Sequence, residues 1–193
     1  MNCRLLWLTA LALAAAEAAF AQTYFPAGAL PDAAAVRYTR FLTAMHEPSL
    51  YELSRQNPGT EAYRLLWLRS DRRPASVRFV VKPGGTGWFY RHMTGGTGST
   101  QPGGLRQYGM SWSWKSRTAS FLGTIDDAGF WSLTAGGSDR QDSCRSHWIL
   151  EGVRQGQYRL IDRCSPPESD PIRIIGVRAM KLAHLRVHRD QVY

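Results

Sequence analysis

The chain has 193 residues and a formal net charge of +9 at pH 7, from 24 Lys and Arg residues against 15 Asp and Glu residues. This length suits one domain with a proper hydrophobic core. Only the N-terminus carries a long apolar run, so the composition excludes further membrane spans and predicts a soluble mature chain.

The first 21 residues have the pattern of a secretory signal peptide. Arg4 forms a short basic region, an apolar run extends from Leu5 to Ala16, and residues 19–21 read Ala-Phe-Ala, a typical cleavage site. The run is short for a membrane span, which takes roughly 20 apolar residues. An uncleaved anchor is the alternative interpretation. We therefore expect a periplasmic or secreted protein that begins at Gln22 and has no transmembrane segment after cleavage.

Two cysteines, Cys144 and Cys164, remain in the mature chain. An even number of cysteines in an exported protein predicts a disulfide. The loop would enclose about 20 residues, for which loop entropy gives roughly 3 kcal/mol of stabilisation. Two separate buried thiols are the alternative, and an oxidising compartment disfavours a catalytic thiol.

Residues 22–31 are expected to form a flexible leader, followed by a single α+β domain over residues 32–190. A helix is predicted to start at Asp32, because apolar residues recur there at helical spacing. A second short helix is predicted over residues 49–56. The apolar stripe of the first helix consists of Tyr38, Phe41, Leu42 and Met45.

Alternating apolar and polar residues then predict an antiparallel meander of about six strands. A short helix is expected over residues 118–129 and a last helix from Asp170-Pro171. The fold class is α+β, with the helices packed on one face of the sheet. The first four expected strands are residues 62–70, 75–82, 88–94 and 105–116.

The last two strands are expected within residues 146–166, SHWILEGVRQGQYRLIDRCSP, around a two-residue turn at Gln155-Gly156. Cross-strand partners then have numbers that sum to 311. This register places Trp148 opposite Arg163, within reach of a cation–π contact of about 0.5–2 kcal/mol.

The other face of this hairpin carries Glu151 and Asp162 as diagonal neighbours, with His147 beside them. A carboxylate pair supports acid–base chemistry when its surroundings separate the two pKa values, so these three residues are the catalytic candidates. In the structural interpretation, the arginines of the hairpin pair with both acids. No known mechanism matches the spacing, which favours the structural interpretation; ligand binding is the third.

Four segments together resemble a family of uncharacterised exported bacterial proteins: EPSLYEL (47–53), YRLLWLR (63–69), FWSL (130–133) and WILEGVRQGQYRLIDRCSP (148–166). The resemblance extends over roughly residues 38–185, and the last segment is the most specific. It implies a shared fold and export, and it carries no activity, ligand or catalytic residue. The chain departs from the family pattern at Cys164, where a Trp is usual.

Two other patterns are weak evidence for a phosphate-binding loop and for a zinc site. The glycine-rich residues 95–104 lack the Gly-Lys-Ser/Thr ending of a P-loop, which favours a mobile loop. His184 and His188 have the i, i+4 spacing of zinc ligands but no HExxH signature. We therefore expect neither a metal nor another cofactor.

The basic residues are the better functional signal. In an exported protein they point to an envelope protein or an anionic envelope polymer as partner, and not to nucleic acid; plain solubility also explains the charge. Trp112 and Trp114 belong to the core if helices cover their face, the preferred interpretation. If that face is open, they form a stacking platform for sugars or a protein. The candidate binding residues are Arg159, Arg163, Trp148, Arg178, Lys181 and Arg189.

The absence of a strong catalytic motif predicts an exported basic binding module, an adaptor or inhibitor of unknown partner. One alternative is a small hydrolase of envelope polymers that uses Glu151 and Asp162. The other is a peripheral protein that attaches to an anionic surface through its last helix.

Overall fold

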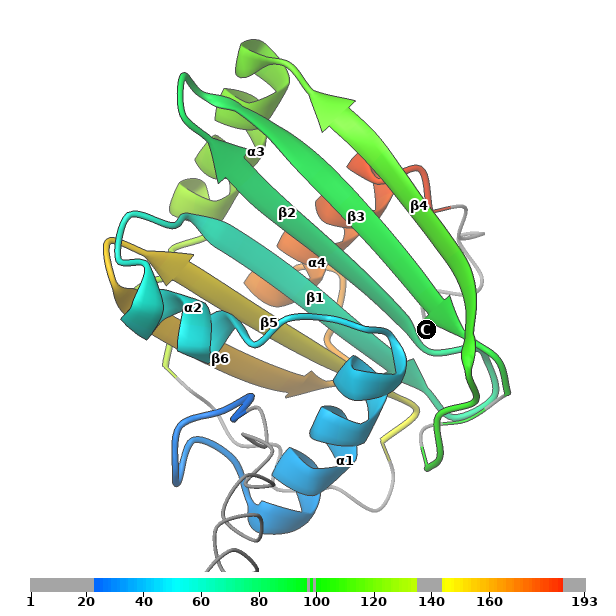
Figure 1. The fold of residues 1–193 in the computed structure, drawn as a ribbon. Helices are drawn as coiled ribbons and strands as arrows, with labels where there is room; N and C mark the ends of the chain where they lie inside the picture. The colour runs from blue at the N-terminus through cyan, green and yellow to red at the C-terminus, as the bar shows by residue number, and fades with distance from the viewer. Residues whose placement is uncertain (1–22, 97, 99, 135–143, 186–193) are drawn as a thin grey trace, which may run out of the picture.

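The computed structural model describes residues 23–96, 98, 100–134 and 144–185. Six antiparallel strands form one sheet in the order β4-β3-β2-β1-β5-β6 (Figure 1). The α+β class is thereby confirmed. The strands are β1 (Ala62–Arg69), β2 (Ala75–Lys82), β3 (Thr86–Thr94), β4 (Leu105–Ser113), β5 (Ser146–Arg154) and β6 (Gln157–Cys164). The helices are α1 (Asp32–Ala44), α2 (Leu50–Gln56), α3 (Lys115–Asp127) and α4 (Pro171–Leu182).

The helices lie on both faces of the sheet, not on one as expected. β1 is a central strand between β2 and β5, and every residue of β1 is buried. Since β1 is apolar on both sides, each face needs cover. Figure 1 shows α3 and α4 behind the sheet, and α1 and α2 in front of β1, β5 and β6.

Each face has its own hydrophobic core. Trp67, Phe79 and Trp148 pack under α3 and α4, whereas Leu66, Leu68 and Ile149 pack under α1. Gly176 lets α4 approach the sheet closely, because a Cβ atom there would lie 2.7 Å from Cζ3 of Trp148.

The expected flexible leader packs against the domain from Thr23 onward. Tyr24 and Phe25 are buried in the core under α1. The Tyr24 hydroxyl donates to the carbonyl of Glu47, and the Ser49 hydroxyl donates to that of Thr23. Two buried aromatic rings hold this segment in place, a contribution that its Pro- and Gly-containing sequence does not reveal.

The β5–β6 hairpin has the predicted register, with Trp148 opposite Arg163 and Ile149 opposite Asp162. Gln155 and Gly156 both have positive φ, of 53° and 74°, as a type I′ turn requires. Such a two-residue turn fixes every pair above it.

The predicted disulfide joins Cys144 to Cys164, with the two Cα atoms 5.4 Å apart. It ties the segment before β5 to the end of β6. Within the part of the chain that the structure describes, no helix combines the length and apolarity needed to cross a bilayer.

Candidate binding face

Helices α1 and α2 cover only half of their face of the sheet. None of the described helices lies over β2, β3 and β4 on this side (Figure 1). Three cross-strand rows run across this region: Val80, Trp88 and Trp112; Arg78, Tyr90 and Met110; Ser76, His92 and Tyr108. We call these nine residues the open face; Ser76 and His92, at its border with the covered half, are buried.

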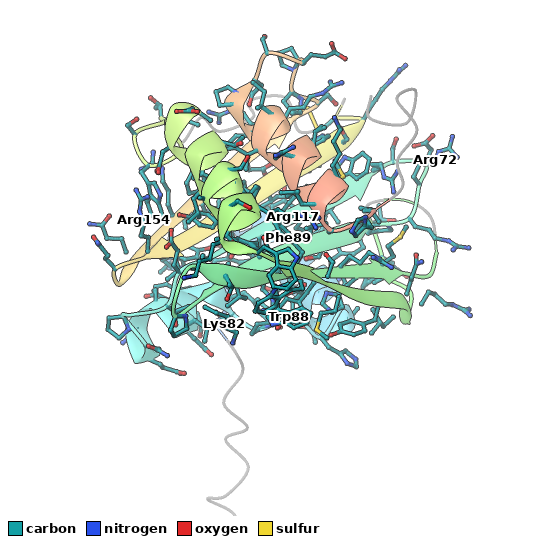
Figure 2. All side chains as sticks on the ribbon, turned by 90° about the horizontal axis from the view of Figure 1, so that it is seen from above. Arg72, Lys82, Trp88, Phe89, Arg117 and Arg154 are labelled. Atoms are coloured by element: carbon teal, nitrogen blue, oxygen red, sulfur yellow. A yellow bond between two sulfur atoms is a disulfide. The ribbon has the colours of Figure 1, made fainter. Side chains whose placement is uncertain are left out.

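Neighbouring residues of β3 point to opposite sides of the sheet. Figure 2 shows the Phe89 side chain directed toward α3 and Arg117, and the Trp88 side chain directed away from α3 and α4. Phe89 is fully buried, and its ring stacks on Phe79 with centroids 4.3 Å apart. Trp88 is half-buried. The alternation within β3 therefore separates core from open face.

The open face presents large apolar side chains to solvent. Tyr108 is 54% exposed, Met110 49% and the neighbouring Trp114 70%. The Trp112 ring lies between Trp88 and Trp114, with centroid separations of 4.9 and 6.0 Å and near-perpendicular planes. The preferred interpretation of Trp112 and Trp114 as core residues is corrected here: no described helix covers their rings, so the open-face alternative applies.

A buried carboxylate lies where the open face meets the covered half. Glu47, between α1 and α2, accepts hydrogen bonds from Ser76, Arg78 and His92 at 2.9, 2.7 and 2.6 Å. Burial raises the pKa of Glu47, but the His92 hydrogen bond and the charges of Arg78 and Arg64 outweigh it and lower that pKa to about 2. Glu47 therefore stays ionised and anchors the α1–α2 connection to three strands.

Glu151 belongs to a second buried network on the covered half. Arg64 Nε donates to Glu151 Oε2 at 2.7 Å, and the Tyr158 hydroxyl donates to Oε1 at 2.8 Å. Both Glu151 and Arg64 are fully buried. Burial raises the pKa of Glu151, and Arg64 opposes this shift. The arrangement is an internal ion pair with both carboxylate oxygens occupied.

Asp162 and His147 form a third cluster with α1. The Tyr38 hydroxyl donates to Asp162 Oδ2 at 2.6 Å, while His147 Nδ1 lies 3.1 Å from that hydroxyl and 3.4 Å from Asp162 Oδ1. Arg37 Nη2 lies 3.1 Å from His147 Nε2. Because a guanidinium group only donates, Nε2 of His147 is the acceptor in its contact with Arg37. These contacts attach α1 to the hairpin.

The three catalytic candidates thus share a face but not a site. Glu151 pairs with Arg64, whereas Asp162 and His147 bond to Tyr38, and both Glu151 and His147 are buried. The expected partners of the acids are corrected as well: Arg64 and Tyr38 come from β1 and α1, outside the hairpin. Residues far apart in sequence supply these contacts, which local spacing does not reveal.

The predicted binding residues differ in their burial and contacts. Trp148 is fully buried against Trp67, with centroids 5.2 Å apart, so it belongs to the core and not to a surface that a partner reaches. Arg163 donates to the carbonyl of Thr134, and Arg178 donates to Ser120. Arg159 is half-buried on β6, Lys181 is exposed on α4, and Arg189 lies outside the described residues.

The half of the sheet that carries the open face is basic. The chain has no Asp or Glu between Asp71 and Asp126. Glu47, the carboxylate at the border of this half, is buried and paired. Besides the alternating aromatic residues, the sequence therefore carries a further signal, a long segment without acidic residues. The basic residues of this acid-free segment are Arg72, Arg73, Arg78, Lys82, Arg91, Arg106, Lys115 and Arg117.

No protein-family model and no curated protein sequence matches this chain. The resemblance to uncharacterised exported proteins therefore stays a prediction. Among the described residues, no group of three or more His, Cys, Asp or Glu side chains is placed to hold a metal ion. His188 of the predicted helical pair lies outside the described residues.

Proposed function

We propose that this protein is an exported binding module and that the open face is its binding surface. The observation that carries the proposal is the uncovered half-sheet, where Tyr108 and Met110 are about half exposed beside Trp88, Tyr90 and Trp112. Contiguous exposed apolar residues on a domain surface are characteristic of an interaction site.

Export is part of the proposal. The N-terminal 21 residues have the pattern of a cleavable signal peptide, and the disulfide between Cys144 and Cys164 is compatible with an oxidising compartment. Candidate partners are therefore components of the cell envelope: a protein or an anionic polymer.

The hydrolase alternative has less support. A catalytic acid must reach substrate, directly or through one water, whereas Glu151 is buried with both oxygens engaged. Attachment through the last helix also has less support: Arg173 of α4 is buried and donates to the carbonyl of Pro166.

The test is capture from envelope extract on immobilised mature chain, residues 22–193, washed at low and high salt. A double substitution Tyr108→Ala/Met110→Ala removes the exposed part of the open face. The control is Ile174→Ala, which truncates an exposed apolar residue of α4 on the other side of the molecule. We expect the double variant alone to lose the captured component. Equal capture by all three proteins would contradict the proposal.

A further inference from the structure

The open face is recessed beside a layer of helices, so that the two form a step. Helices α1 and α2 lie on the same side of the sheet as the open face, over β1, β5 and β6 (Figure 1). A helix layer has a thickness of about 10 Å, so it forms a wall beside β2. A flat bilayer rests on the top of such a step and does not reach Tyr90 or Trp88. The step suits a partner segment about one layer thick.

The side chains of the open face resemble those of a protein–protein interface. Trp, Tyr, Met and Arg are the residues enriched at such interfaces, whereas Asp, Glu and Ser are depleted. The open face carries Trp88, Tyr90 and Met110 and has no accessible carboxylate. Polar groups that bind sugar hydroxyls are scarce there, because Arg78 and His92 already contact Glu47. The near-perpendicular Trp rings also give no flat platform for a sugar.

Charge defines the complementary partner. Lys82 is exposed and lies on the same side of the sheet as Trp88 (Figure 2). With no Asp or Glu between Asp71 and Asp126, this half of the sheet favours an acidic partner and repels a basic one. A second copy is disfavoured for the same reason, since neither of two facing open faces would offer an accessible carboxylate to Lys82 of the other.

From these observations we infer that the open face docks an acidic protein: a segment whose apolar side chains pack on Trp88, Tyr108 and Met110 and whose carboxylates face Lys82. This inference rests on the proposed function and adds the chemistry of the partner.

The experiment places a photo-crosslinking amino acid, p-benzoylphenylalanine, at Met110 in the full-length protein produced in its native host. The matched control carries it at Ile174, which has a similar exposure on α4. We expect a protein adduct from Met110 that is absent from the Ile174 control. The crosslinked protein is then purified and titrated against wild type, Lys82→Glu and Lys181→Glu.

We expect the affinity for the crosslinked protein to fall about tenfold or more with Lys82→Glu, to stay near wild type with Lys181→Glu, and to weaken as salt rises. Both substituted lysines are exposed, so neither variant is expected to unfold. A protein adduct whose affinity ignores Lys82→Glu would overturn the inference. So would a polysaccharide, a lipid or a second copy of this chain as the adduct, although an anionic polysaccharide would leave the proposed function intact. The absence of any adduct at Met110 would overturn both.

Discussion

Glu47 and His92, 45 residues apart in sequence, are joined by a hydrogen bond of 2.6 Å between Oε1 and Nδ1. The same carboxylate lies 2.7 Å from Arg78 Nε and 3.8 Å from Arg64 Nη1. This bond attaches the α1–α2 connection to β3, at the border between the covered half of the sheet and the open face.

Substituting Glu47 by Gln is expected to destabilise the fold by about 3–5 kcal/mol, because Arg64 and Arg78 lose a buried counter-charge. The measurement is the urea unfolding midpoint. Asp127→Asn, which neutralises an exposed carboxylate on α3, is the control and should shift the free energy of unfolding by less than about 0.5 kcal/mol. A loss for Glu47→Gln no larger than that of the control would show that the network contributes nothing.

The pKa of Glu47 also predicts a pH dependence. It falls from its ordinary value of 4.5 to about 2 in the folded protein. A lowered carboxyl pKa stabilises the fold above the unfolded value, and this stabilisation disappears as the pH falls from 4.5 toward 2. The difference in unfolding free energy between wild type and Glu47→Gln should therefore shrink by up to about 3 kcal/mol over that range. A difference that stays constant from pH 5 to pH 2 would contradict the assigned pKa.

The hairpin was predictable from sequence because its contacts are local. A two-residue turn fixes the register, so the pairs Trp148–Arg163 and Ile149–Asp162 follow from Gln155-Gly156 alone. The binding face was not predictable in this way. Alternation places Met110 and Trp112 on one face of β4, but which face stays uncovered depends on where α1 and α2 dock. That docking depends on buried polar contacts between distant segments, such as Tyr38–Asp162 and Glu47–His92.

Two helix glycines give opposite predictions for the same substitution. Gly123→Ala on α3 adds a Cβ atom with nothing within 4 Å and should raise stability by roughly 0.5–1 kcal/mol through helix propensity. Gly176→Ala on α4 places its Cβ against the buried Trp148 ring and should lower stability by about 1–3 kcal/mol. Thermal unfolding of both variants checks the pair. A stabilising shift for both variants would mean that α4 does not approach the sheet this closely.

The disulfide should contribute measurably to stability. Replacing Cys144 and Cys164 by Ser opens a loop with a sequence separation of 20 and should reduce the unfolding free energy by about 3 kcal/mol. Guanidinium unfolding with and without reductant measures this. Reductant should lower wild-type stability to near that of the double variant and leave the variant unchanged. Wild-type stability that is insensitive to complete reduction would contradict this role.

The open face should be dispensable for folding, which is what separates a binding surface from a core. Met110→Ala truncates a side chain that is already 49% exposed, so the unfolding free energy should change by less than about 0.5 kcal/mol. Phe89→Ala truncates a fully buried ring on the opposite face of the neighbouring strand and should cost about 3–5 kcal/mol. Urea unfolding of the two variants makes the comparison. A loss above about 2 kcal/mol for Met110→Ala would be too large for an exposed residue, and would mean that this face is covered within the folded chain. A small loss of unfolding free energy would mean that the fold does not need this side chain, which is what a binding role for the open face requires.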